Sequence, residues 1–191
     1  MTYEHYIAGE WVTDGAVSIN INPSNTDDIV GEFSRGDAAR VDKAVAAANA
    51  AQPDWAAASP QLRHDVLEKA SNLITSRKDE LGRLLSREEG KTLAEGIGET
   101  MRAAQVFKFF AGEAIRNVGD AVASIRPGID VTVEREAVGT IGLITPWNFP
   151  IAIPAWKLAP ALAFGNAVVM KPAELTPGCA WELAKILQEA G

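Results

Sequence analysis

The 191-residue sequence has little of what several protein classes depend on. It holds one cysteine and two histidines. A single cysteine excludes an internal disulfide, and these residues are too few for a convincing metal cluster. No apolar run approaches membrane-spanning length, and the first residues lack the character of a signal peptide. We therefore expect a soluble cytoplasmic protein with no metal site.

Positive charge is also scarce. The sequence has 18 lysines and arginines against 25 aspartates and glutamates, which gives a net charge of −7 at pH 7, and it has no basic cluster. Nucleic acids and anionic membranes attract clustered positive charge, so we expect neither as a partner. There is no internal repeat, and the length suits one domain or slightly more.

The first part of the chain is predicted to be mostly helical. Residues 6–12 and 17–21 predict a hairpin joined by a loop over residues 13–16. Asp37, Ser59 and Thr92 are suitable N-caps for three helices, and Glu95 completes a capping box with Thr92. The expected apolar face of the first of these helices carries Val41, Val45 and Ala48. Residues 122–125 and 131–135 predict two further strands, separated by Arg126-Pro127-Gly128.

The most informative stretch is an apolar run that stops abruptly at residues 145–150. Residues 139–144 are short, apolar and bounded by glycine and proline, which predicts a buried strand. Pro146 and Pro150 stiffen the segment that follows. Asn148 therefore lies on a stiff loop at the carboxyl end of a strand, where ligands bind in open α/β sheets. Its amide could donate hydrogen bonds to a developing oxyanion without titrating.

A second apolar run, residues 166–170, repeats this layout and ends in Lys171-Pro172-Ala173-Glu174. Residues 151–164 are long enough for a crossover helix, and Gly165 could end it. Strand, helix and strand with short connections predict a parallel pair. Both motifs should therefore lie at the same edge of one sheet. Thr176 followed by Pro177 predicts the N-cap of a last helix.

With these motifs in place, the chain resembles the aldehyde dehydrogenase superfamily over nearly its whole length. The pieces that carry the resemblance, in family order, are Tyr6-Ile7-Ala8-Gly9-Glu10-Trp11, Asn22-Pro23, Glu88-Glu89-Gly90-Lys91, Thr145-Pro146-Trp147-Asn148-Phe149-Pro150, Pro154-Ala155-Trp156-Lys157-Leu158-Ala159-Pro160-Ala161-Leu162, Gly165-Asn166, Lys171-Pro172-Ala173-Glu174 and Thr176-Pro177. Within the superfamily the chain looks most like the semialdehyde dehydrogenases, especially those that act on 2-oxoglutarate semialdehyde (2,5-dioxovalerate).

The resemblance implies an α/β fold that is the N-terminal part of the aldehyde dehydrogenase fold and is incomplete. Residues 1–120 would form the N-terminal hairpin and helices of the nucleotide-binding domain. Residues 121–138 would form bridging strands used in oligomerisation, and residues 139–191 the first strand–helix–strand–helix of a Rossmann-like parallel sheet. The full-length parent would be a homo-oligomer that oxidises an aldehyde, expected to be a semialdehyde, to a carboxylate through a cysteine thiohemiacetal.

The resemblance also assigns roles to individual residues. Asn148 would hydrogen-bond the oxyanion of the thiohemiacetal. Lys171 and Glu174 would contact the adenosine ribose or a 2′-phosphate of NAD or NADP. The residues expected to line the cofactor site by packing and backbone contacts are Ile144, Thr145, Pro146 and Trp147. The Glu174 carboxylate favours NAD because it would repel a 2′-phosphate, while Lys171 softens this preference.

Cys179 is the only thiol, but the family's nucleophile and general base lie in later segments that this chain does not reach. We therefore expect Cys179 to be buried and inert, and the 191 residues alone to be inactive. Two alternatives stay open. The chain could be a non-catalytic nucleotide-binding or interaction module, or pseudo-enzyme, that pairs with full-length subunits. It could also be an acyl-transfer enzyme that uses Cys179.

Overall fold

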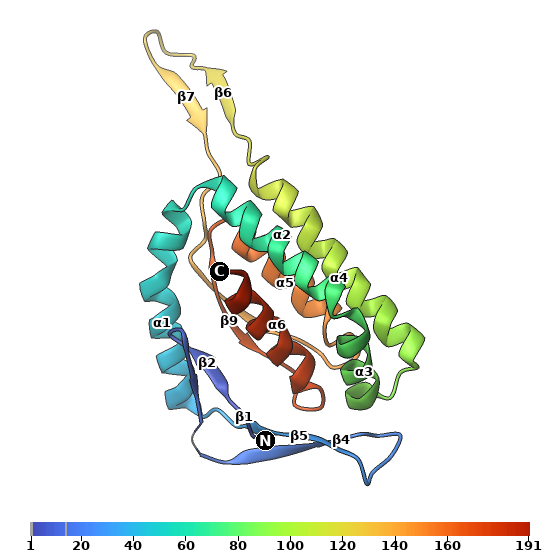
Figure 1. Cartoon of the computed structure of the whole chain (residues 1–191). Helices are drawn as coiled ribbons and strands as arrows, with labels where there is room; N and C mark the ends of the chain where they lie inside the picture. The colour runs from blue at the N-terminus through green and yellow to red at the C-terminus, as the bar shows by residue number, and fades with distance from the viewer. Residues whose placement is uncertain (1, 14) are drawn as a thin grey trace.

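The computed structural model describes residues 2–13 and 15–191 and has the predicted α/β fold class. Short N-terminal strands precede four helices, an antiparallel hairpin and a strand–helix–strand–helix unit (Figure 1). The helices are α1 Ala38–Ala57, α2 Pro60–Ser76, α3 Lys78–Glu89, α4 Leu93–Ala114, α5 Ala152–Ala163 and α6 Pro177–Ala190. The strands are β1 Thr2–Tyr3, β2 His5–Ile7, β3 Glu10–Val12, β4 Val17–Ile21, β5 Ile29–Ser34, β6 Asp120–Ala123, β7 Asp130–Val133, β8 Thr140–Ile144 and β9 Ala167–Lys171.

The predicted starts of the first, second and fourth helices are confirmed by their caps. The Asp37 carboxylate accepts from the Arg40 N–H at 2.8 Å, and the Ser59 hydroxyl accepts from the Leu62 N–H at 3.1 Å. Thr92 and Glu95 form the complete capping box at the start of α4. Each cap satisfies backbone donors that have no partner inside the helix.

The hydrophobic core lies among α2, α3, α4, α5 and α6. Its largest fully buried side chains include Phe107, Leu67, Ile74 and Leu183. In contrast, α1 has no buried residue. The apolar face expected on α1 is not buried in this chain, because Val41 and Val45 are both exposed.

Helix α1 lies against strands β8 and β9 and also contacts β2. The Trp55 indole N–H donates to the Leu162 carbonyl at 3.0 Å and the Gln52 amide donates to the Gly165 carbonyl at 3.1 Å. Two side chains of α1 therefore bond to the chain at and just after the end of α5.

The predicted hairpin between residues 6–12 and 17–21 is wrong. Residues 6–12 contain their own turn, because Ala8 and Gly9 both adopt positive φ, as the favoured two-residue hairpin turn requires. Strands β2 and β3 pair across this turn, and β4 pairs instead with β5. The predicted connecting loop at residues 13–16 includes Asp14, which lies outside the described residues.

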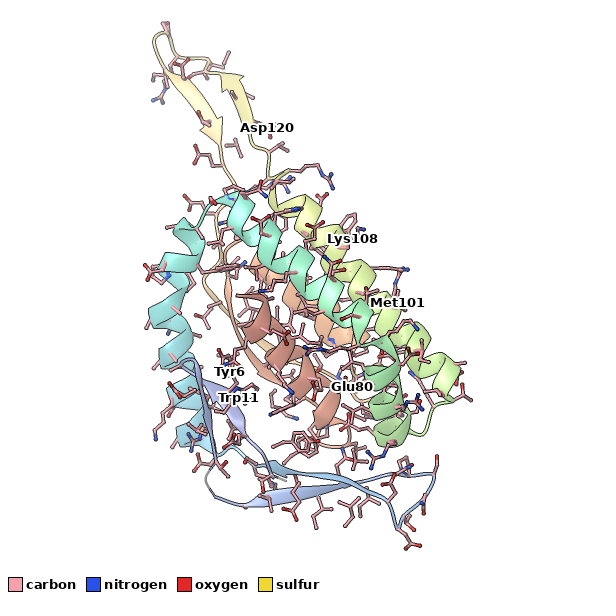
Figure 2. The ribbon with its side chains drawn as sticks, in the orientation of Figure 1. Tyr6, Trp11, Glu80, Met101, Lys108 and Asp120 are labelled. Carbon is pink, nitrogen blue, oxygen red and sulfur yellow. The ribbon has the colours of Figure 1, made fainter. Side chains whose placement is uncertain are left out.

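An aromatic cluster fastens the N-terminal strands to α6. Tyr3 stacks on Phe33 with ring centroids 4.4 Å apart, and it makes a T-shaped contact with Trp181 with ring centroids 4.9 Å apart. Trp11 lies 4.9 Å from Trp181 and 4.8 Å from Tyr6, its neighbour across the hairpin (Figure 2). The N-terminal strands and α6 are thus packed together although they are far apart in the sequence.

The hairpin of β6 and β7 projects away from the helices (Figure 1). Its strands pair antiparallel, with Asp120 opposite Val133 and Ala123 opposite Asp130, and all their residues are exposed. Both strands begin and end slightly earlier than residues 122–125 and 131–135. Asp120 marks the base of the hairpin, where the chain leaves α4 (Figure 2).

The strand–helix–strand prediction is confirmed. Strands β8 and β9 are parallel, α5 connects them, and Ile144 pairs with Lys171 at the carboxyl end. Asn166 fixes the other end of the pair: its side-chain oxygen accepts from the Gly139 N–H at 3.0 Å, and its amide donates to the Ala161 carbonyl at 3.1 Å. Gly165 has φ +82°, and a Cβ there would lie 3.0 Å from the backbone of Ala56. Only glycine suits that position.

Candidate active site

The loop that follows β8 occupies the carboxyl edge of the strand pair. Thr145 is buried, and its N–H donates to the Lys171 carbonyl at 3.4 Å. Pro146, Trp147, Asn148 and Phe149 are exposed. Within the part of the chain that the structure describes, the Asn148 side chain makes no hydrogen bond. Its amide is therefore a free donor at an edge where α/β sheets bind ligands.

The β9 motif lies at the same edge, as predicted. The register of the strands sets Ile144 opposite Lys171, and Ile144 is 82% exposed. The Lys171 ammonium and the Glu174 carboxylate form an ion pair at 2.6 Å, with side chains 49% and 80% exposed. The hydrogen bond from Lys171 is the main cause of a lowered pKa of Glu174. An exposed pair of this kind contributes little to stability, so both charges are available to a ligand.

The five residues predicted at the β8 end do not all face the same way. Ile144, Pro146, Trp147 and Asn148 are exposed, while Thr145 is only 6% exposed. Thr145 therefore offers a cofactor little side-chain surface. Its backbone N–H extends the β8–β9 ladder by bonding to the Lys171 carbonyl. The remaining residues form a mixed apolar and polar surface beside the Lys171–Glu174 pair.

Two further charged residues, for which the sequence predicts no role, hold the Asn148 loop. The Lys91 ammonium donates to the Asn148 carbonyl at 2.7 Å, and the Glu99 carboxylate accepts from the N–H groups of Ile151 and Ala152 at 3.1 Å each. A signal for Glu99 was present: it lies on the buried face of α4 with Gly96 and Ala103. A carboxylate on such a face requires partners.

Glu88 is a second buried carboxylate without a predicted role. It accepts from the N–H groups of Gly178 and Cys179 at 2.7 and 2.8 Å, and from the Asn20 side chain at 2.8 Å. The predicted start of α6 is confirmed, with Thr176 at the N-cap position and Pro177 as the first residue, but the Thr176 side chain makes no capping bond and its buried hydroxyl has no partner among the described residues. Glu88 provides the cap instead, from a helix 90 residues away in sequence.

Cys179 has the buried environment that was expected. It is completely buried, and burial together with the nearby Glu88 charge raises the pKa of the thiol well above its usual range. The thiolate is the reactive form of cysteine, so this environment disfavours nucleophilic chemistry. The structure therefore argues against acyl transfer by Cys179.

A shallow groove runs between α4 and α5, beyond the Asn148 loop. Its lining residues are Arg102, Gln105, Val106, Phe109, Phe110 and Trp156. Trp156 lies about one turn into α5, the helix that begins directly after the loop. Phe109 and Trp156 are 59% and 49% exposed. The groove thus presents apolar rings with one guanidinium at its wall.

These features describe an α/β protein whose strand pair carries, at its carboxyl edge, a free amide and an exposed lysine–glutamate pair. A model of the aldehyde dehydrogenase family matches residues 11–191, and the chain belongs to that family. No helix in residues 2–13 and 15–191 is long and apolar enough to cross a membrane.

Relatives match this chain along nearly its whole length. It is 42% identical over 190 residues to the alpha-ketoglutarate semialdehyde dehydrogenase of Haloferax volcanii. The aligned region covers 98% of this chain and 39% of that protein. A solved NADP-dependent enzyme of E. coli superposes with a TM-score of 0.96 at 36% identity, covering 100% of this chain and 40% of the other.

A variant of betaine aldehyde dehydrogenase from Staphylococcus aureus, solved in complex with NAD⁺, superposes with a TM-score of 0.95 at 32% identity. That match covers 99% of this chain and 39% of the other. The chain therefore spans about two-fifths of the length of the relatives that it matches.

Proposed function

We propose that the full-length protein oxidises an aldehyde to a carboxylate with NAD or NADP, and that these 191 residues supply the oxyanion amide and part of the adenosine site. The observation that carries the proposal is the β8–β9 register, which sets the Asn148 loop and the Lys171–Glu174 pair at one sheet edge. Family membership supports the reaction class.

The proposed chemistry divides between this chain and the rest of the protein. A cysteine thiolate from a later segment would add to the aldehyde carbonyl, and the Asn148 amide would donate to the oxygen as it gains negative charge. The nicotinamide cofactor accepts the hydride when it is bound, which leaves a thioester on the cysteine. Water would then hydrolyse the thioester, releasing the carboxylate and the cysteine thiol. Glu174 would accept from the adenosine ribose hydroxyls, and Ile144, Pro146 and Trp147 would pack along the cofactor.

The assembly and the location of the protein belong to the same proposal. We propose a cytoplasmic homo-oligomer in which residues 121–138 bridge subunits. The exposed apolar side chains of the β6–β7 hairpin support this role, because they have no cover in the described chain. Residues 1–120 and 139–191 would together form the part of the nucleotide-binding domain that this chain contributes.

The direct test is oxidation of 2-oxoglutarate semialdehyde by the purified full-length protein. Reduced nicotinamide is followed by its absorbance, with NAD and NADP in separate assays. Formation of the reduced cofactor and of the carboxylate product in equal amounts supports the proposal. Cofactor binding without aldehyde-dependent reduction would contradict it and favour a non-catalytic module.

Glu174→Gln should change the choice between the two cofactors. We expect kcat/KM for NAD to fall several-fold relative to kcat/KM for NADP, because the substitution weakens the bond to the ribose and removes repulsion of a 2′-phosphate. Lys171→Met should shift the ratio in the opposite direction. Glu189→Gln, an exposed carboxylate on α6, is the control. An unchanged ratio in both variants would leave Glu174 and Lys171 without a cofactor role.

The α4–α5 groove supports a semialdehyde substrate, because it combines apolar rings with the Arg102 guanidinium. The aliphatic part of the substrate would lie along Phe109 and Trp156, and Arg102 would pair with the carboxylate at its far end. Several relatives, among them the Haloferax protein, are named as dehydrogenases of semialdehydes that carry a carboxylate.

Arg102→Met should therefore lower kcat/KM for a carboxylate-bearing semialdehyde by about tenfold, the equivalent of one charged hydrogen bond. A neutral aldehyde of equal length should be affected much less, since methionine keeps the groove apolar. Arg116→Met removes an exposed guanidinium just after α4 and is the matched control. An equal fall in kcat/KM for both aldehydes would show that Arg102 does not bind the substrate carboxylate.

A further inference from the structure

The loop from Thr145 to Ala152 is held at its start, middle and end. The Thr145 N–H bonds to the Lys171 carbonyl, the Asn148 carbonyl accepts from Lys91, and the N–H groups of Ile151 and Ala152 donate to Glu99. Only the first of these bonds belongs to the sheet. The other contacts come from α4 and from the short segment before it.

Lys91 reaches the loop from the turn between α3 and α4. Gly90 ends α3 in the left-handed conformation, with φ +87°, and Lys91 follows it. The ammonium lies 2.7 Å from the Asn148 carbonyl oxygen, 2.9 Å from a Glu99 oxygen and 3.2 Å from a Glu89 oxygen. It also lies 3.9 Å from the centre of the Phe149 ring, within the range of a cation–π contact.

Two carboxylates surround Lys91, and this bears on whether Lys91 would stabilise an oxyanion by its charge or hold the loop by its geometry. Its side chain is 21% exposed, whereas those of Glu89 and Glu99 are 6% and 4% exposed. Burial opposes the charge of Lys91, but the two carboxylates outweigh it and raise the pKa of the ammonium. The ammonium already pairs with two carboxylates and contacts the Asn148 carbonyl, not its side-chain amide, so Lys91 acts by geometry.

Glu99 fixes the other end of the loop. Helix α5 begins after Ile151, which provides no side-chain cap. The Glu99 oxygen that accepts from both Ile151 and Ala152 takes the place of that cap, and its other oxygen pairs with Lys91. A negative charge at a helix N-terminus is stabilising. One carboxylate therefore joins the start of α5 to the residue that holds Asn148.

We propose that Lys91 and Glu99 are positioning residues that hold the Asn148 amide in its donating geometry. The inference rests on the proposed function, in which Asn148 binds the oxyanion. The Asn148 side chain has no hydrogen-bond partner among the residues that the structure describes, so its position depends on the backbone of the loop. A preorganised donor stabilises charge without reorganising during the reaction, and a displacement of about 1 Å can cost 10²-fold in rate.

The test is a double-mutant cycle in the full-length protein with Lys91→Met and Asn148→Ala. We expect Lys91→Met to lower kcat by about 10- to 100-fold with little change in the dissociation constant of the cofactor. In the Asn148→Ala background the same substitution should cost less than about threefold, because residues that act through one another are not additive. Lys91→Arg, which keeps the charge, should recover part of the rate.

Lys78→Met is the matched control, since Lys78 is an ion-paired lysine at the surface of α3, and we expect it to leave kcat unchanged. Glu99→Gln keeps an acceptor for the start of α5 but loses the charge that pairs with Lys91. It should give a smaller loss of kcat. If Lys91→Met does not fold, the double-mutant cycle is made with Glu99→Gln and Asn148→Ala instead. An equal cost of the Lys91 or Glu99 substitution with and without Asn148 would overturn the proposal.

Hydrogen exchange of the cofactor-free protein provides a readout that needs no turnover. Peptides that cover residues 145–152 should exchange faster in Lys91→Met and Glu99→Gln than in the wild type, and at the wild-type rate in Lys78→Met. Unchanged exchange in the first two variants would also overturn the proposal. If the wild-type protein shows no aldehyde oxidation, the proposed function fails, while the exchange experiment still decides whether Lys91 and Glu99 hold the loop.

Discussion

Asn148→Ala in the full-length enzyme should lower kcat by on the order of 10²–10³, the usual cost of removing one oxyanion donor. The side chain is exposed at the carboxyl edge of β8 and has no hydrogen-bond partner among the described residues, so it does not hold the fold together. We therefore expect cofactor affinity and thermal stability to change little. The measurement is kcat with saturating aldehyde, combined with a cofactor titration.

Asn148→Asp is the companion variant, because aspartate keeps the size of the side chain but replaces the donor by an acceptor. A negative charge facing the oxyanion should reduce kcat at least as much as alanine does. If either variant keeps its kcat and instead binds the nucleotide weakly, Asn148 is a cofactor ligand and the role proposed here is wrong.

The pH dependence of stability should change most strongly in Glu88→Gln. Burial raises the pKa of Glu88 from its ordinary 4.5 to about 7, although the N–H groups of Gly178 and Cys179 partly oppose this. The folded state thus holds a proton that the unfolded chain releases. The stabilisation is complete below about pH 4.5 and is lost as the pH rises through 7. A shift of this size corresponds to about 3 kcal/mol.

We expect the free energy of unfolding of the wild type to fall by this contribution between pH 5 and 8, and the fall to be absent in Glu88→Gln. The comparison is made by denaturant unfolding of the full-length protein at each pH, as the difference between wild type and variant. Glu80→Gln changes an exposed carboxylate on the same helix (Figure 2) and should follow the wild-type curve. Parallel curves for Glu88→Gln would show that Glu88 does not titrate in this range.

The elements that sequence patterns predicted well are those governed by near neighbours. Asp37, Ser59 and Thr92 cap helices because each side chain reaches an N–H group three residues ahead. The strand–helix–strand unit followed from its apolar runs and from Gly165, which tolerates the positive φ that ends the crossover. The hairpin prediction failed at Ala8 and Gly9, because their two-residue turn pairs β2 with β3 and leaves β4 to pair with β5.

Sequence patterns alone predict the fold class, the parallel strand pair and the edge at which Asn148, Lys171 and Glu174 lie, because strand direction and register fix where each motif ends. The contacts that hold the Asn148 loop at that edge depend on how distant elements pack. Lys91 and Glu99 contact the Asn148 loop although they lie more than 50 residues away from it in the sequence. Glu88, not Thr176, provides the side-chain cap of α6. Buried charges take their partners from whichever elements pack against them, and no local pattern encodes that choice.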